Sequence, residues 1–396
     1  MIDDSLNSSL VWIVLCVVRI AIRRRCPPPL DTIPRRPGEI PLSRLAVVFA
    51  ARGRFASIKK TLDCLQSQTA VDRIDLLLTS DSPALLREAE RHIQARGVLV
   101  NPRFLLNHTP ELASARLIAA RAATADILTI AGDHSFPDPN FAEELLAVFD
   151  SVPEILAASP LVHNPNSETA VSRAYFILAH GCLNPIPGSS RTSEAARLPW
   201  HNTTYRRTAF LSAARDVGLM QAEGLLQAEI RRTTPNARFV HCQQTALWHV
   251  NISRLGPALW ETFHGGRVFG AERARYERWG QGVRLVRAGL FPLVAVRKVI
   301  QCSHQFFSNS FPVQSMATLA CASLLAFAHA FGESVGNILG KGDSAVQGAN
   351  WEYNRARFLK PEERHLVVSE GAFAGLPSLQ AKRFETSQPQ AMIPDG

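Results

Sequence analysis

The chain has 396 residues but only seven cysteines, and the cysteines form no recognisable set. No two of them are spaced as C-x-x-C, so neither a thiolate zinc site nor a disulfide framework is indicated. This use of cysteine favours a reducing compartment. The length is ample for one large domain with appendages, or for two domains.

Nucleic-acid-binding signatures are missing too. The sequence contains no RNP, zinc-finger or helix-turn-helix pattern, so we predict no nucleic acid among its partners. Acidic residues are outnumbered, with 43 Lys and Arg against 34 Asp and Glu, and the formal net charge is +9. A basic balance of this kind favours phospholipid headgroups or sugar diphosphates as partners.

The sequence also lacks a long uninterrupted apolar run near its start. Leu10 to Ile22 is apolar except for Arg19 and falls short of the ~20 residues that span a bilayer. It has no A-x-A cleavage site, and its arginine cluster follows the apolar core instead of preceding it. We expect a membrane-surface or weak signal anchor, or a poorly ordered N-terminal helix, followed by a stiff Pro-rich linker over 27–41.

Two C-terminal segments carry the other membrane signals. Leu285 to Ile300 mixes apolar and basic residues, and Val313 to Phe331 is nearly uncharged and about long enough to cross a bilayer once. Polar residues inside the second segment make interfacial helices an equal explanation, and a helix packed on the main domain is a third. Basic residues gather on the cytoplasmic side of membranes, so we expect the main domain at the cytoplasmic face.

Strand and helix patterns alternate between residues 45 and 104. Continuous apolar runs predict buried strands, and apolar residues at helical spacing predict amphipathic helices. We expect strands over 45–50 and 74–78, a third strand within 98–104, and helices over 56–68 and 84–96. This alternation predicts an α/β fold with a mostly parallel sheet and flanking helices.

An acidic turn follows the next helix and strand. A small-residue helix over 113–124 and an apolar strand over 127–131 lead to Gly132, Asp133 and His134, and prolines then forbid any continuation. Groups at the carboxyl end of such a strand face the ligand crevice of an open sheet. A carboxylate beside an imidazole there can hold a divalent cation and a diphosphate; a solvated turn is the plainer alternative.

These residues resemble the metal-binding turn of family 2 glycosyltransferases, which have the GT-A fold. The family carries a helix start A-R-N-x-G, a strand G-D-I-L-x-F-L and a D-x-D turn before a proline; this chain has S-A-R, A-D-I-L and G-D-H-S-F-P in the same order. His134 or Ser135 stands where the family has its second carboxylate, and histidine suits Mn²⁺ better than Mg²⁺. The resemblance covers about residues 44–270 and implies a GT-A, Rossmann-like sheet, followed by apolar and amphipathic C-terminal helices.

The resemblance also implies an activity and a cofactor. It implies an inverting transfer of a sugar from a nucleotide diphosphate sugar to a hydroxyl acceptor, a glycan or a lipid-linked group, with a divalent metal ion, Mn or Mg. Asp133 and His134 would hold the metal. Arg52, after the first strand, and Asp81, after the second, would lie on the donor side together with Arg116.

Three later stretches complete the implied site. Glu223 opens a run similar to the family's E-D-x-x-L helix start and would be the general base, although Gly224 replaces the second acid; a charge in the first turn of a helix is the alternative. Arg267 lies in H-G-G-R-V, which resembles a degenerate Q-x-x-R-W signature. The two glycines would allow close backbone approach, and the arginine would bind the diphosphate. The acceptor side would be formed by Trp200, His201 and Asn202.

The predicted organisation has four parts: an N-terminal apolar segment and linker (1–41), a glycosyltransferase domain (42–270), amphipathic and membrane-associated helices (271–341) and a polar C-terminal tail (342–396). The second acid of the turn and the acid after Glu223 are both absent. Their absence leaves a second hypothesis open, a degenerate, non-catalytic member that binds a nucleotide or a partner at the membrane. A nucleotidyltransferase is a third, although its glycine-rich signature after the first strand is absent.

Overall fold

The computed structural model describes residues 44–185, 191–199, 203–308 and 314–368. The predicted N-terminal anchor and linker, the expected acceptor residues Trp200, His201 and Asn202, and the end of the predicted tail lie outside these ranges. All statements about structure below concern the described ranges.

The first half of the sheet is parallel, as predicted. β1 (Leu45–Ala51) lies between β2 (Ile74–Ser80) and β4 (Ile127–Ala131), and β2 pairs with β3 (Arg103–Leu106). Each residue of β1, β2 and β4 is buried. Burial on both faces explains why these strands are continuous apolar runs instead of alternating ones.

The predicted helices of this half are also present, with ends set by local chemistry. α2 (Ala56–Gln66), α3 (Pro83–Arg96) and α4 (Leu112–Ala122) each follow a strand. At the start of α3 the Ser82 hydroxyl accepts a hydrogen bond from the backbone N–H of the helix's third residue. The helix ends at Gly97, whose φ of +65° is a conformation that glycine adopts without strain.

The second half of the sheet is mixed. β8 (Thr204–Arg206) runs antiparallel between β4 and β6 (Ile155–His163), and β6 is parallel to β9 (Arg238–His249). The strand order is β3-β2-β1-β4-β8-β6-β9-β5, where β5 is Ser135–Pro137, and β7 (Thr192–Glu194) pairs with β9. The predicted α/β architecture is confirmed.

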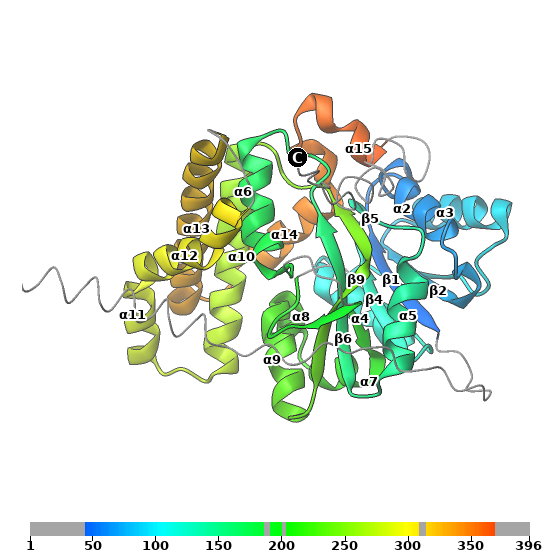
Figure 1. Cartoon of the computed structure of the whole chain (residues 1–396), viewed down its shortest axis with the longest axis horizontal. Helices are drawn as coiled ribbons and strands as arrows, with labels where there is room; N and C mark the ends of the chain where they lie inside the picture. The colour runs from blue at the N-terminus through cyan, green and yellow to red at the C-terminus, as the bar shows by residue number, and fades with distance from the viewer. Residues whose placement is uncertain (1–43, 186–190, 200–202, 309–313, 369–396) are drawn as a thin grey trace, which may run out of the picture. The chain divides into compact units, whose positions relative to one another are not determined.

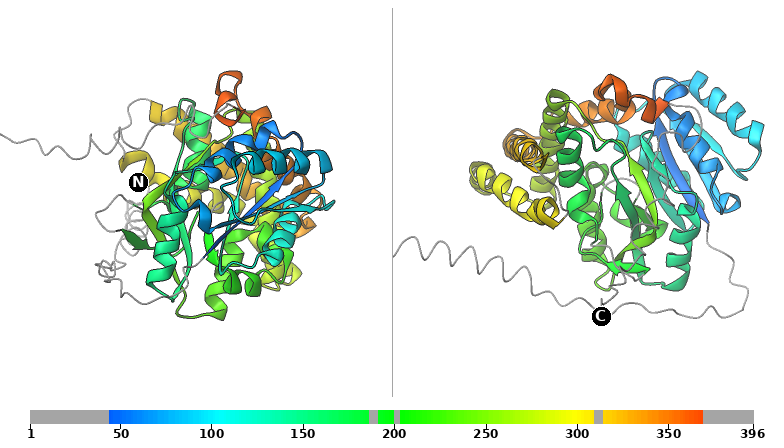
Figure 2. Two further views of the ribbon diagram at one scale, coloured as in Figure 1. Left: turned by 90° about the vertical axis from the view of Figure 1, so that its right-hand side faces the viewer. Right: turned by 45° about the horizontal axis from the view of Figure 1, so that its top comes forward.

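Helices cover both faces of this sheet (Figures 1 and 2). Val47 and Phe49 of β1 belong to a core that includes α2, α3 and α5 (Phe141–Ser151). Ala46 and Val48 belong to a second core, on the α4 side. The two cores hold the carboxyl ends of β1, β2 and β4 along one edge, where the site lies.

Helices follow the sheet and pack largely on one another. They are α10 (Leu255–Tyr276), α11 (Gln281–Gly289), α12 (Phe291–Ser308) and α13 (Gln314–Leu339). α10 runs unbroken through residue 270, where the sequence predicted a domain boundary. The helix pair α10–α13 is therefore continuous with the glycosyltransferase-like part of the chain.

Glycines bring α10 and α13 close together. A Cβ on Gly266 or Gly270 of α10 would collide with backbone carbonyls of α13, and a Cβ on Gly332 or Gly336 of α13 would collide with carbonyls of α10. Only hydrogen leaves room for this approach. The second glycine of H-G-G-R-V thus admits a neighbouring helix.

The chain then returns to the carboxyl ends of the parallel strands (Figure 1). The returning elements are α14 (Ser344–Tyr353), η3 (Arg355–Phe358), η4 (Pro361–Glu363) and α15 (His365–Val368). Ala349 and Tyr353 pack with Ala50 of β1, and Lys60 Nζ of α2 donates to the Leu366 carbonyl oxygen at 2.7 Å. The described part of the predicted polar tail (342–396) is thus an ordered segment packed at the sheet edge.

Candidate active site

The acidic turn is buried, and its two side chains are joined. Asp133 and His134 follow β4 and are 5% and 1% exposed. Asp133 Oδ1 lies 2.7 Å from His134 Nδ1, and Arg355 Nη2 lies 3.0 Å from His134 Nε2. A guanidinium can only donate hydrogen bonds, so Nε2 is the acceptor. His134 therefore carries its proton on Nδ1 and donates it to Asp133.

Burial disfavours the charged form of a side chain at this turn. Burial raises the pKa of Asp133 well above its usual range, and the nearby Glu352 adds to the rise, whereas Arg355 and Arg116 act in the opposite direction. Burial also acts to lower the pKa of Arg355, but acidic groups around it raise that pKa overall: Tyr175, Glu352, Glu261 and Asp133. Arg355 thus stays charged and supplies a buried cation to this cluster.

Glu352 links the cation to the next helix. Its Oε1 lies 3.0 Å from Arg355 Nη2, and its Oε2 lies 3.4 Å from Arg116 Nη2 of α4. One carboxylate therefore spans two guanidinium groups, one from the C-terminal segment and one from the helix before the acidic strand.

A second ion pair lies at the ends of β1 and β2. Arg52 Nε and Asp81 Oδ2 are 3.1 Å apart. The guanidinium of Arg52 also donates to the Thr109 carbonyl oxygen and lies over the Tyr353 ring, 5.2 Å from its centroid. Tyr353 thus connects this pair to the segment that holds Glu352 and Arg355.

The structure brings together five of the predicted site residues along one sheet edge: Arg52, Asp81, Arg116, Asp133 and His134. The residues that join them, Glu352, Tyr353 and Arg355, were missed by the sequence analysis. Arg355 lies 221 positions from His134 along the chain, and no local pattern reports a contact of that range. The one local indication of these three residues was the run W-E-Y-N-R over 351–355, which places an acid, a tyrosine and an arginine close together in the sequence.

Glu223 stands at the start of α9 (Glu223–Thr233) and is half-buried. Its Oε1 accepts a hydrogen bond of 2.6 Å from the Tyr205 hydroxyl, to which Gln227 Nε2 donates at 3.3 Å. Burial, followed by the charge of Glu223, raises the pKa of Tyr205 well above its usual range, so the phenol keeps its proton. Tyr205 of β8 pairs with Leu128 of β4, so its hydrogen bond connects Glu223 to the strand that neighbours β4.

The place of the family's second acid beside Glu223 is taken by another side chain. A Cβ on Gly224 would lie 2.6 Å from Arg197 Nη2, so any larger residue would displace that arginine. The chain after Arg197 is tied to α9, because the Leu198 N–H donates to Gln227 Oε1 at 3.0 Å. The expected acceptor residues 200–202 come directly after this tie, outside the described ranges.

Arg267 is bound to the helix pair. Its Nε donates to the Gly340 carbonyl oxygen, just beyond the end of α13, at 3.0 Å. A cation is favourable at the carboxyl end of a helix. Within the described ranges no hydrogen bond or ion pair joins Arg267 to the acidic turn. The contact gives it a structural role that the sequence did not indicate.

Comparison with protein families identifies the first part of this arrangement. The family model described as Glycosyl transferase family 2 matches residues 46–212. The match begins in β1 and contains Arg52, Asp81, Arg116 and the acidic turn. Residues 46–212 are a family 2 glycosyltransferase domain. Glycosyl transfer is therefore the general activity that the comparison supports.

Known proteins add little detail about this domain. No curated protein matches the sequence. Among solved structures, S. aureus TarS residues 1–349 in complex with UDP is 12% identical, covers 77% of this chain and 92% of its own, and has a TM-score of 0.39. The mannosyltransferase PcManGT from Pyrobaculum calidifontis, in complex with GDP-Man and Mn²⁺, is 12% identical, covers 87% and 94%, and has a TM-score of 0.46. Similarities this low assign no role to any residue here.

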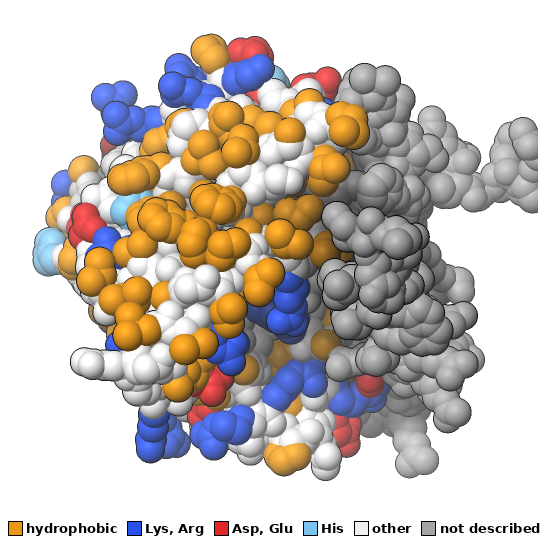
Figure 3. Space-filling view, turned by 90° about the vertical axis from the view of Figure 1, so that its left-hand side faces the viewer, with side chains coloured by type: hydrophobic (Ala, Val, Ile, Leu, Met, Phe, Trp, Pro, Cys, Tyr) orange, Lys and Arg blue, Asp and Glu red, His pale blue; other side chains and the backbone are white. Residues whose placement is uncertain are grey.

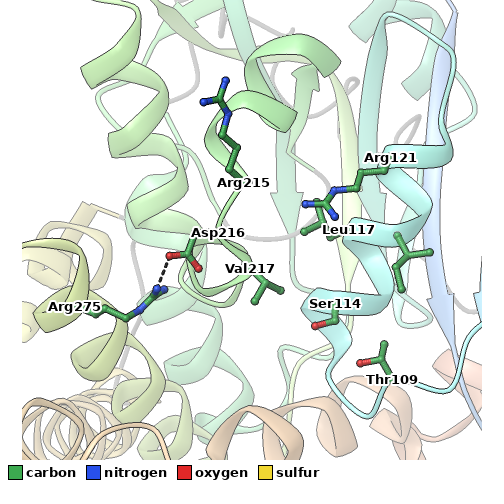
Figure 4. Close-up of a pocket in the computed structure, with 9 residues that line it drawn as sticks. Thr109, Ser114, Leu117, Arg121, Arg215, Asp216, Val217 and Arg275 are labelled. Atoms are coloured by element: carbon green, nitrogen blue, oxygen red, sulfur yellow. Dashed lines mark hydrogen bonds and ion pairs between the residues drawn. The ribbon is translucent and has the colours of Figure 1, made fainter.

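The family 2 domain also borders an open cleft of about 620 Å³ beside α4 (Figure 4). Arg121 of α4 and Arg275 of α10 extend into it from opposite walls, and Arg215 also lines it. Arg275 is paired with Asp216. Thr109 also lines the cleft, and its carbonyl oxygen accepts a hydrogen bond from Arg52. The excess of guanidinium groups favours an anionic ligand there.

The residues of the turn do not fit a divalent cation as they are arranged. His134 donates through Nδ1 to Asp133 and accepts through Nε2 from Arg355, so both ring nitrogens are engaged. Among the described residues there is no group of three or more His, Cys, Asp or Glu side chains that could hold a metal. A metal at Asp133 and His134 would require Arg355 to leave.

Proposed function

We propose that the protein transfers a sugar from a nucleotide diphosphate sugar to a hydroxyl acceptor, a glycan or a lipid-linked group, with inversion at the anomeric carbon. The observation that carries the proposal is the row of Arg52, Asp81, Arg116 and the acidic turn at the carboxyl edge of a family 2 domain. Open α/β sheets bind their ligands at this edge.

In the proposed reaction Glu223 is the general base. The acceptor hydroxyl oxygen attacks the anomeric carbon while Glu223 takes the hydroxyl proton. The bond between the anomeric carbon and the diphosphate oxygen breaks, and that oxygen keeps the electron pair. A single displacement of this kind inverts the anomeric centre. The hydrogen bond from Tyr205 supports the role because it fixes the orientation of the Glu223 carboxylate.

A non-catalytic member that binds a nucleotide or a partner is the second candidate. Two observations favour it: the turn has one acid, and the Glu352 carboxylate lies between Arg116 and Arg355, where a donor anion would compete with it.

Turnover of nucleotide sugars separates the two candidates. Full-length protein is incubated with a panel of nucleotide sugars and hydroxyl acceptors, in parallel samples with Mn²⁺ and with EDTA, and release of nucleoside diphosphate is measured. Release, with or without a glycosylated product, supports the enzyme. Measurable donor binding without release from any donor supports the second candidate.

We also propose that α11, α12 and α13 bind the cytoplasmic face of a membrane. Hydrophobic side chains gather on the face of the molecule formed by these helices (Figure 3). Within the described ranges one segment, Met316–Leu339 of α13, is long and apolar enough to span a bilayer, with a mean hydropathy of 1.3. The large apolar residues that are exposed in this helical region are Val283, Leu285, Val286, Leu290, Leu293, Val296, Ile300, Met316, Leu324, Phe327, Phe331, Ile338 and Leu339. Arginines of α11 and α12 would add attraction to anionic lipid.

A further inference from the structure

The acidic turn contains a positive charge that belongs to the chain itself. Arg355 arrives from the C-terminal segment, is 1% exposed, and donates to His134 Nε2 at 3.0 Å. It thereby places a fixed cation beside Asp133 and His134, where the family resemblance put a divalent metal.

Several buried guanidinium donors have no protein partner. Among the described residues no hydrogen-bond acceptor reaches Nε or Nη1 of Arg355, or Nε of Arg116. Buried charged donors without acceptors are costly, so such groups indicate a ligand that supplies acceptors. An anion with several oxygens would suit these donors, because they belong to two cations.

Glu352 shows where such an anion would lie. One of its oxygens is 3.0 Å from Arg355 Nη2 and the other is 3.4 Å from Arg116 Nη2. A carboxylate has two oxygens and one charge, whereas a diphosphate has more of both and matches the planar fork of arginine. The side chains of Glu352 and Arg116 are each 14% exposed, so solvent reaches this position from outside.

We propose that Arg116 and Arg355 form a clamp that binds the diphosphate of the donor without a divalent cation, and that Glu352 is an internal carboxylate which the diphosphate displaces. This rests on the proposed function for the identity of the diphosphate as that of a sugar donor. The clamp lies on the same sheet edge as Arg52 and Asp81. Its two guanidinium groups would meet the negative charge that develops on the leaving diphosphate.

Binding of inorganic pyrophosphate to the full-length protein tests the clamp. In EDTA, calorimetry should show binding by the wild type. Arg355→Lys keeps the charge but loses the fork, so its Kd should rise by about tenfold or more. Glu352→Gln removes the competing charge, so its Kd should fall severalfold. Arg357→Lys is the matched control, because Arg357 is exposed and lies two positions from Arg355; its Kd should equal that of the wild type.

Three outcomes would overturn the clamp. They are binding that needs Mn²⁺ and vanishes in EDTA, an Arg355→Lys variant that binds like the wild type, and a Glu352→Gln variant that binds more weakly. Thermal unfolding of each variant separates lost binding from lost structure, and Glu352→Gln decides the matter alone if Arg355→Lys does not fold. Pyrophosphate binding is independent of sugar turnover, so a failure to consume any nucleotide sugar contradicts the proposed function and leaves the clamp supported.

Discussion

His134 is the residue that allows an arginine into the acidic turn. An imidazole accepts on one nitrogen and donates on the other, so it connects Arg355 to Asp133 through one ring. A carboxylate at this position could only accept, and would face Asp133 as a like charge. His134 thus replaces the second carboxylate of the D-x-D pattern, and Arg355, a basic residue distant in the chain, binds to it.

We expect Glu223→Gln to lower turnover by about 10²- to 10⁴-fold, the usual loss when a general base is removed. The amide is nearly isosteric and still accepts the hydrogen bond from Tyr205, so donor binding should persist. Glu229→Gln is the control on the same helix, because Glu229 is held by Arg232 and Tyr276. Steady-state kinetics with the best donor measures both variants. A loss below about tenfold in Glu223→Gln would assign the base elsewhere.

The Cys182 thiol gives a prediction about pH. A hydrogen bond with Cys302 lowers the pKa of Cys182 below its usual value. The thiolate is the reactive form, so alkylation of Cys182 by iodoacetamide should reach its midpoint at a pH below the ~8.5 of an ordinary thiol. Cys302→Ala removes the bond and should move this midpoint upward. Peptide mass spectrometry follows the reaction, with Cys321 as the slow reference because burial raises its pKa. A rate that is flat from about pH 6 to about pH 8 contradicts the prediction.

A site residue can be predicted from the sequence when its neighbours in the sequence determine its position, and not when long-range packing does. Asp133 and Asp81 were predictable because each follows an apolar strand, and the carboxyl ends of parallel strands share an edge. Arg355 and Glu352 were not, because packing of the C-terminal segment brings them to the turn. Arg267 was assigned to the diphosphate from a motif, whereas its position beside α13 depends on the helix crossing.

At the scale of elements, the crossing of α10 and α13 fixes how the C-terminal helices join the sheet domain. Gly266 and Gly270 on one helix and Gly332 and Gly336 on the other bring the two backbones into contact. The crossing then sets where α13 ends and where the segment that carries Arg355 begins its return to the sheet.

We expect Gly266→Ala to lower the free energy of unfolding by about 1–3 kcal/mol, because its Cβ would overlap the His329 carbonyl oxygen and force the helices apart. Gly265→Ala is a matched control one position away, since a Cβ there meets nothing within 4 Å. It should instead stabilise the protein by about 0.5–1 kcal/mol, because alanine favours helix over glycine. Denaturant unfolding measures both. Equal effects of the two substitutions would contradict the close crossing.

The elements themselves were largely readable from local patterns. The buried strands β1, β2 and β4 and the helices between them follow apolar runs and helical spacing, and the structure confirms them. A third strand was expected within 98–104, and β3 spans Arg103–Leu106, which overlaps the end of that range. β8 is three residues long and pairs with β4 and β6, so no local pattern defines its bounds.

At the scale of the whole molecule, the apolar face of α11–α13 and the basic charge of the chain act together. The net charge is +9, which attracts the protein to anionic lipid over roughly a Debye length, about 8–10 Å in physiological salt. Contact then depends on the apolar side chains, which salt does not screen.

We therefore expect full-length protein to float with vesicles that contain anionic lipid, and high salt to weaken this binding only in part. Replacing Val286, Leu293 and Phe327 by glutamine should lower vesicle binding by about a hundredfold, because the three apolar side chains no longer enter the bilayer. Val100→Gln is the control, since Val100 is 56% exposed in the loop before β3, outside this face. A wild-type protein that stays monomeric in solution without detergent and does not float would contradict the membrane proposal.

The contact between Arg355 and the acidic turn has a consequence for biosynthesis. The turn is translated 221 residues before its cation. At about 5–20 residues per second, the ribosome takes roughly 10–45 s to cover that interval. During this time the sheet can begin to form, although Arg355, which binds the acidic turn, has not yet been synthesised. A transcript truncated before codon 355 would yield a domain with every described strand and an acidic turn that has not received its positive charge.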